Sequence, residues 1–214
     1  MKKLFACLLL GALSQSVWAL DAADQQRLNS IQQSWAHIQY ETPEKQRAAA
    51  FEQLATQATH FATERPAVAE AWIWKGIVTS SWAGAEGGLG ALGKAKDAKA
   101  DLEKSLTLDP KALQGSAYTS LAALYDRVPG WPIGFGDSDK AEQLLKQALQ
   151  FNPEGIDSLY FWGDHLYRQK RYAEARAALQ KALQAAPRPG RESADAGRRK
   201  EIAALLVDVN KKLD

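Results

Sequence analysis

Four prolines divide most of the chain into units of comparable length. Pro66, Pro110, Pro153 and Pro187 stand 44, 43 and 34 residues apart, and each follows an amphipathic stretch. Proline lacks an amide hydrogen and its ring clashes with the preceding turn, so each of the four ends a helix. Apolar residues in these stretches recur every three or four positions, whereas no segment alternates with the period of a strand. The spacing therefore predicts an all-α fold of repeated helical hairpins.

The last unit, residues 154–187, resembles the 34-residue tetratricopeptide repeat. The matching positions are Leu159, Trp162, Gly163, Leu166, Tyr172, Ala175, Leu179, Ala182 and Pro187. Gly163 and Ala175 are small, as required where two helices cross closely. Two earlier units match less completely, since Lys75 and Ser105 stand where the repeat usually has leucine and alanine. The resemblance implies a short right-handed solenoid of antiparallel helix pairs.

The repeat units suggest a division of the chain into four parts. We expect a signal peptide, an N-terminal helical pair, three repeat units, and a linker with a C-terminal capping helix. These parts span residues 1–19, 20–68, 69–187 and 188–214. The last helix is amphipathic and would cover the apolar face that the final repeat leaves open.

The first nineteen residues have the pattern of a secretory signal. Lys2 and Lys3 precede an apolar run at 4–13 that is too short to span a bilayer, and cleavage is expected after Ala19. An uncleaved anchor is the alternative. Cys7 lies too close to the basic pair to belong to a lipoprotein box. Export to the periplasm or the medium follows from this interpretation.

Charge and composition narrow the class of protein. Cleavage after residue 19 would leave 25 basic and 25 acidic residues, with no cysteine and no methionine. A balanced charge argues against a nucleic-acid binder, and the lack of cysteine argues against disulfides and thiolate metal sites. Packing alone must therefore hold the exported chain together.

Two insertions distinguish the first and second units from the standard repeat. Residues 84–93 are glycine-rich, and residues 129–135 combine glycine and proline with aromatic side chains. We expect both to lie between the two helices of their unit, side by side on one edge of the solenoid, where insertions often build a binding surface. The partner-binding candidates there are Leu89, Trp131, Ile133 and Phe135. The alternative is that these side chains pack back over the helix ends.

The concave groove of the first helices is a second candidate surface. By resemblance to the family, its residues in the last unit are Asp157, Tyr160, Asp164, Tyr167 and Arg168. In the middle unit they are Ser116, Thr119, Ala123, Asp126 and Arg127. Mixed charge with tyrosine suits a peptide or protein segment. The alternative is an ordinary solvated helix face.

Other chemical signals are weak. Residues 88–93 satisfy the G-x-G-x-x-G string, but helices rather than a strand flank it, so dinucleotide binding is not expected. His37, His60 and His165 lack metal-ligand spacing and are expected at the surface or partly buried. The basic segment 188–200 is interpreted as a solvated linker and helix start; the alternative is contact with an acidic partner or anionic lipids. No cofactor and no metal are expected.

These observations favour a non-catalytic exported scaffold or adaptor that binds a partner protein or peptide in the cell envelope. The alternative is a small-molecule carrier, or an accessory subunit of a solute transporter such as the exported repeat subunits that the chain weakly resembles. An enzyme is not expected. Neither nucleic-acid binding nor a membrane span after signal cleavage is expected, whereas self-association through an open end of the solenoid is a further possibility.

Overall fold

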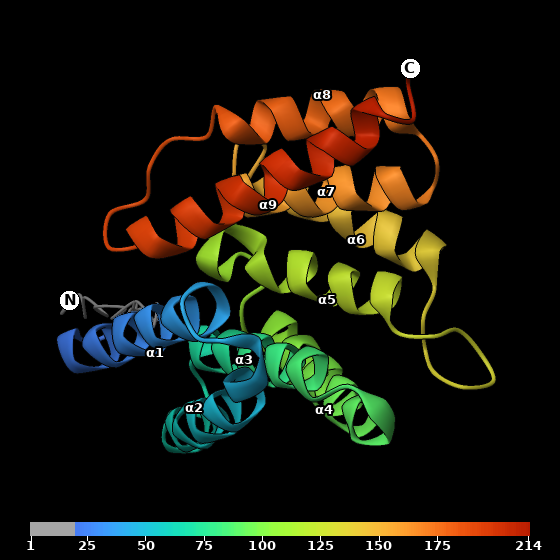
Figure 1. Ribbon diagram of the computed structural model, residues 1–214. Helices are drawn as coiled ribbons and strands as arrows, with labels where there is room; N and C mark the ends of the chain where they lie inside the picture. The colour runs from blue at the N-terminus through green and yellow to red at the C-terminus, as the bar shows by residue number, and fades with distance from the viewer. Residues whose placement is uncertain (1–19) are drawn as a thin grey trace, which may run out of the picture.

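The computed structural model describes residues 20–214, which form nine α-helices and one short 3₁₀ turn (Figure 1). Within this part of the chain an isolated bridge between Gly130 and Gly136 is the sole β-type pairing. The predicted all-α, repeat-like fold is confirmed. The predicted signal peptide, its cleavage site and Cys7 lie outside the described residues. Between residues 20 and 214, no helix is both long enough and apolar enough to cross a membrane.

The helices form successive antiparallel pairs, followed by one further helix (Figure 1). The pairs are α1 (Ala22–Tyr40) with α2 (Glu44–Glu64), α3 (Ala69–Glu86) with α4 (Gly88–Leu108), α5 (Ser116–Arg127) with α6 (Ser138–Phe151), and α7 (Ile156–Arg168) with α8 (Tyr172–Leu183). The 3₁₀ turn Ala112–Gly115 precedes α5, and α9 (Glu192–Asn210) ends the array. Pro66, Pro110, Pro153 and Pro187 all lie in the segments between pairs, as the sequence predicts.

Glycine allows the two helices of a pair to approach closely. A Cβ atom at Gly163 of α7 would lie 2.7 Å from Cγ of Leu179 on α8. At Gly76 of α3 it would lie 2.6 Å from Cγ of Leu102 on α4. Both leucines are fully buried, so neither can move aside freely. The first and third repeat units therefore use the same small-against-large contact.

The core is continuous through the first three pairs and has a second cluster in the last pair with α9. Phe51 and Phe61 of α2 anchor the first cluster, and Leu166, Leu179 and Ile202 anchor the second; all five are almost completely buried. Burial of these apolar side chains is the main favourable contribution to folding.

Helix α9 does more than cap the last repeat. It packs on α8 and α7, and it also reaches back to α1 at the start of the array (Figure 1). Gly197 of α9 lies against the ring of Tyr40, which a Cβ atom would approach to 2.3 Å. Ser193 donates a hydrogen bond of 2.5 Å to Glu41 just after α1. The C-terminal helix thus joins the two ends of the array.

Instead of lying between the two helices of its unit, the glycine-rich segment 84–93 is almost entirely helical. Helix α3 continues to Glu86 and α4 begins at Gly88, with Gly87 alone between them at a φ of +65°. The extra residues lengthen both helices, because tertiary packing outweighs the low helix propensity of glycine. The G-x-G-x-x-G string therefore lies in the first turns of α4. Leu89 also lies there, and its side chain is outside the described part of the structure.

The second predicted insertion is a loop between α5 and α6, on the right of Figure 1. It lies beside α4, since a Cβ atom at Gly134 would be 3.3 Å from Cδ1 of Leu92. The two insertions are therefore neighbours on one edge of the array, although the first one is helical.

We expect Gly163→Ala to destabilise the fold by about 1–3 kcal/mol, because its methyl group would overlap buried Leu179. Gly93→Ala is the matched control: it lies exposed in α4 with open space at its Cβ position, and should stabilise the protein by about 0.5–1 kcal/mol. Urea unfolding of the two variants measures both effects. Equal effects of the two substitutions would contradict close packing at Gly163.

Candidate functional site

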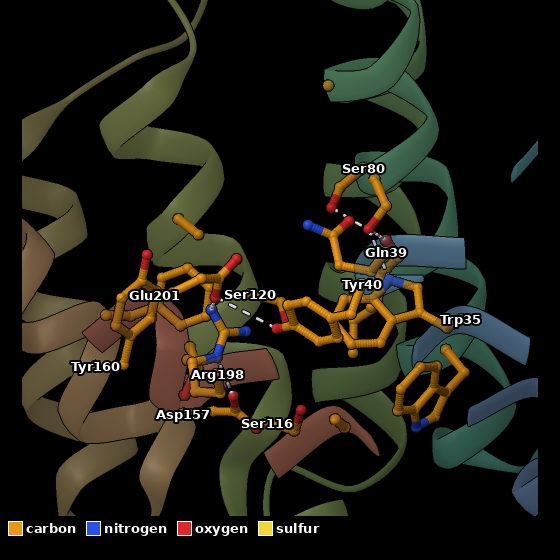
Figure 2. A pocket seen from close by; sticks show the side chains of 18 of the residues that line it. Trp35, Gln39, Tyr40, Ser80, Ser116, Ser120, Asp157, Tyr160, Arg198 and Glu201 are labelled. Atoms are coloured by element: carbon orange, nitrogen blue, oxygen red, sulfur yellow. Dashed lines mark hydrogen bonds and ion pairs between the residues drawn. The ribbon is translucent and has the colours of Figure 1, made fainter. Parts of the chain in front are cut away.

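A cavity of about 410 Å³ lies between the first helices of the pairs and α9. Side chains from α1, α3, α5, α7 and α9 form its walls, with a contribution from α2. In Figure 2, Trp35 and Ser80 lie at one end. Asp157 and Arg198 lie at the other end, and the Tyr40 ring lies between the two. Helices from every pair, together with α9, thus surround this part of the concave face.

Small residues on the inner helix faces keep this space open. On α5, Ser116, Ser120 and Ala123 follow a spacing of four and three, which places them on one face. On α3, Ser81 and Gly84 also line the cavity. Larger side chains at these positions would fill the space, so the small residues at these positions determine the volume of the cavity.

Charged and phenolic side chains join three helices at one end of the cavity. Nε of Arg198 donates to Asp157 at 2.8 Å, and its Nη1 donates to Glu201 at 2.6 Å. Nη1 of Arg188 donates to the second oxygen of Asp157 at 2.7 Å. The Tyr40 hydroxyl donates to Glu201 at 3.3 Å. This network, which we call the Arg198 network, connects α1, α7 and α9.

The charges in the Arg198 network stabilise one another. Burial raises the pKa of the Asp157 carboxyl, but Arg198 and Arg188 outweigh that effect and hold it well below its usual range. Burial would lower the pKa of Arg198, yet Asp157 and the other acidic groups around it raise it. Burial is the main reason why the pKa of Tyr40 is raised. The guanidinium carbon of Arg198 also lies 4.4 Å from the ring centre of Tyr160.

Aromatic side chains line the opposite end of the cavity. The indole nitrogen of Trp35 donates to Ser81 at 2.8 Å. The Trp35 ring meets Tyr40 and Trp74 edge to face, with ring centres 5.8 and 6.0 Å apart. Such pairs hold large apolar surfaces in one orientation.

The predicted groove residues of the last unit divide into two sets. Asp157 and Tyr160 line the cavity, whereas Asp164, Tyr167 and Arg168 do not. Asp164 is buried and accepts hydrogen bonds from Arg168 at 3.2 Å and from a second arginine on α5. The Tyr167 ring packs on α8. A binding role for any of these residues stays a prediction.

In the middle unit, four of the five predicted groove residues line the cavity. They are Ser116, Thr119, Ala123 and Arg127. Arg127 also donates to Asp164 at 2.9 Å. The fifth, Asp126, instead forms hydrogen bonds with His165.

The loop between α5 and α6 has both a packed and an exposed part. The Phe135 ring meets Tyr125 edge to face at 5.5 Å, and the Lys99 ammonium lies 5.8 Å from its centre. Trp131 and Ile133 are 90% and 68% exposed. The Phe135 side chain therefore packs back onto the helices, whereas the side chains of Trp131 and Ile133 face solvent. Partner binding by this loop stays a prediction.

His165, which the sequence predicts at the surface or partly buried, is fully buried between α5, α6 and α7. Its Nδ1 lies 3.0 Å from both carboxylate oxygens of Asp126, and its Nε2 lies 3.3 Å from Glu142. The Trp162 ring stacks on it at 5.7 Å. None of these side chains lines the cavity, so the cluster joins helices within the fold. Within residues 20–214, no group of three or more His, Cys, Asp or Glu side chains has the arrangement of a metal site.

The basic segment 188–200 is not a solvated linker. Arg188 and Arg198 belong to the Arg198 network, and Arg191 lines the same cavity. Sequence reasoning missed these three residues. One signal was available, because Arg198 precedes the buried Ile202 by four positions and so shares the inner face of the helix.

Comparisons with known protein families identify repeats in the chain. Family models described as tetratricopeptide repeat match residues 133–196 and 89–112. The chain contains tetratricopeptide repeats. The resemblance predicted from the proline spacing and the last unit is confirmed.

A solved structure of another repeat protein shares the fold. TTC0263, a thermophilic TPR protein of Thermus thermophilus, is 17% identical, with coverage of 86% of this chain and 99% of that chain and a TM-score of 0.57. MamA (41-end) from Desulfovibrio magneticus RS-1 is 16% identical, with coverage of 91% and 97% and a TM-score of 0.47. No curated protein sequence matches the chain significantly.

The stability of the protein should depend on the charge of His165. Burial would lower the pKa of the imidazole, but Asp126 and Glu142 together raise it. A raised pKa contributes stability below the unfolded value of about 6.5, and this contribution is lost as the pH rises through the folded value. We expect His165→Gln to cost more free energy of unfolding at pH 5.5 than at pH 9, as measured by urea titration. Asp126→Asn should reduce the pH dependence, and a cost independent of pH would contradict the charged cluster.

Proposed function

We propose that the protein is an exported, non-catalytic scaffold that binds a short segment of a partner protein in the cavity between its first helices and α9. The tetratricopeptide-repeat fold supports a role in protein interaction. The observation that carries the finer proposal is the cavity itself, which draws its walls from every helix pair of the array. A volume of about 410 Å³ falls within the usual range for ligand pockets, which is about 300–1,000 Å³.

The lining suits a peptide segment. Rigid aromatic rings at one end offer apolar contact, and serine hydroxyls and arginines offer hydrogen bonds to a backbone. Side chains that are already held in place lose little entropy when a ligand binds. The exposed Trp131 and Ile133 provide a second contact outside the cavity.

Export rests on the basic start, the short apolar run and Ala19 in the sequence. Self-association stays a prediction as well. At the end of the array, the exposed apolar side chains are Leu183, Val207 and Leu213.

Photo-crosslinking in cells tests the docking proposal. Gln39 lines the cavity on α1, and Gln147 lies exposed on the outer face of α6. With p-benzoylphenylalanine in place of Gln39, ultraviolet light should join the protein to a partner chain and give a heavier species on a denaturing gel.

The same amino acid at Gln147 is the matched control and should give no such species. At Trp131 it reports on the loop separately. Crosslinks from Gln147 alone, or from neither position, would contradict docking in the cavity.

The export proposal predicts a shortened chain in the envelope. We expect the protein purified from the periplasm or medium to begin at Leu20, with a mass lower by the nineteen residues before it. Intact-mass spectrometry measures this. A full-length chain that remains with the membrane fraction would favour an uncleaved anchor.

A further inference from the structure

Positive charge exceeds negative charge around the cavity. Five arginines and three carboxylates line it. They are Arg47, Arg127, Arg188, Arg191 and Arg198, with Glu44, Asp157 and Glu201. The lining thus carries a net charge of two positive units.

Most of these arginines have acidic partners. Arg188 and Arg198 share Asp157, and Arg127 pairs with Asp164 on α7. Arg47 donates its Nε to the backbone oxygen of Thr42 at the edge of the cavity. Arg191 differs from all of them, because its buried Nε has no acceptor among the described residues.

The surroundings of Arg191 are energetically unfavourable for its charged guanidinium. Its Nε is buried without a hydrogen-bond partner, and burial together with Arg188 lowers the pKa of its guanidinium. The guanidinium carbon lies 5.2 Å from the ring centre of Trp74. Trp74 is only 4% exposed, lines the same cavity, and its indole N–H also lacks an acceptor. Two neighbouring buried donors therefore lack the partners that a folded protein normally provides.

From this juxtaposition we infer that the cavity binds a carboxylate group, which Arg191 holds beside Trp74. The inference rests on the proposed function, since the carboxylate belongs to the bound peptide segment as an acidic side chain or as the chain terminus.

Shape and charge both suit a carboxylate. The guanidinium is a planar fork of N–H donors that matches the two oxygens of a carboxylate. The net charge of two positive units in the lining attracts an anion. The proposed occupant is a peptide segment, and the anionic group of an unmodified peptide is a carboxylate.

Thermal unfolding with defined probes tests the inference on the full mature chain. The first probe is a mixture of N-acetylated tetrapeptides that lack Asp and Glu and carry a free terminal carboxylate. The second is the same mixture with amidated termini, and the third is an amidated mixture that contains Glu. Succinate and inorganic phosphate serve as small anions. A ligand that binds only the folded chain raises its melting temperature in proportion to affinity and concentration.

We expect the first or the third mixture to raise the melting temperature more than the second, and the stronger of the two identifies the source of the carboxylate. Arg191→Gln should weaken this binding about tenfold or more, since a charge-assisted hydrogen bond is lost. Arg191→Lys keeps the charge without the fork and should bind with intermediate affinity. Arg176→Gln removes one exposed arginine on α8 that does not line the cavity, and should bind like the unsubstituted protein.

The ligand-free stability separates binding from a structural role. Because the Nε of Arg191 is buried without an acceptor among the described residues, the melting temperature of Arg191→Gln without probe should be no lower than that of the unsubstituted protein. A clear decrease, with binding unaffected by the substitution, would assign Arg191 to the fold and overturn the inference.

Two outcomes distinguish this inference from the proposed function. Equal stabilisation by free and amidated mixtures, unaffected by Arg191→Gln, would overturn the carboxylate site and leave peptide docking intact. Stabilisation by succinate alone, lost in Arg191→Gln, would support the carboxylate site and contradict peptide docking, in favour of a small-molecule carrier. No response to any carboxylate probe at millimolar concentration would overturn the inference.

Discussion

A buried arginine lies at the centre of the polar network that joins the C-terminal helix to the rest of the array. Arg198 is 7% exposed and lies between Asp157 on α7 and Glu201 on its own helix, while Glu201 in turn accepts from Tyr40 on α1. Removal of the arginine would leave Glu201 without its ion-pair partner and Asp157 with Arg188 alone, which would weaken the link between α7 and α9. The contact between α9 and α1 also includes the hydrogen bond of Ser193 and the packing of Gly197. Because α9 forms one wall of the cavity, these contacts help to bound it.

Local periodicity was enough to predict the repeated hairpins. The proline spacing marks where helices end, and the pairing of Gly163 with Leu179 and of Gly76 with Leu102 follows from the alternation of small and large residues at fixed positions. These signals are short-range or repeat along the chain, so they can be recognised in a single sequence. The sequence also predicted that Tyr160 and Ser116 lie on the concave face, and both line the cavity. This was possible because every third or fourth residue of a helix lies on the same face.

Long-range polar contacts and helix length were not predictable in the same way. Asp157 and Arg198 are 41 residues apart, and an arginine-rich stretch has the same composition whether it is solvated or buried beside carboxylates. Glycines at 84–93 have low helix propensity, which favours a loop, yet the long α3–α4 hairpin stabilises the helical form. In both cases the deciding interaction lies in another part of the fold. The loop between α5 and α6 is a further example. Phe135 packs on Tyr125 and Lys99 while Trp131 stays exposed, and only the folded structure brings these side chains together.

Closure by α9 changes what the concave face of a repeat array can recognise. An open groove can accept a long segment along its length and contact it at many points. A bounded space of about 410 Å³ has room for a few residues at most, so fewer contacts must provide the selectivity. Buried polar groups are effective for this purpose, because a ligand that leaves them unpaired pays their desolvation cost without compensation. A carboxylate would satisfy the unpartnered donors of Arg191 and Trp74, whereas a segment without an acceptor at this place would leave both unpaired.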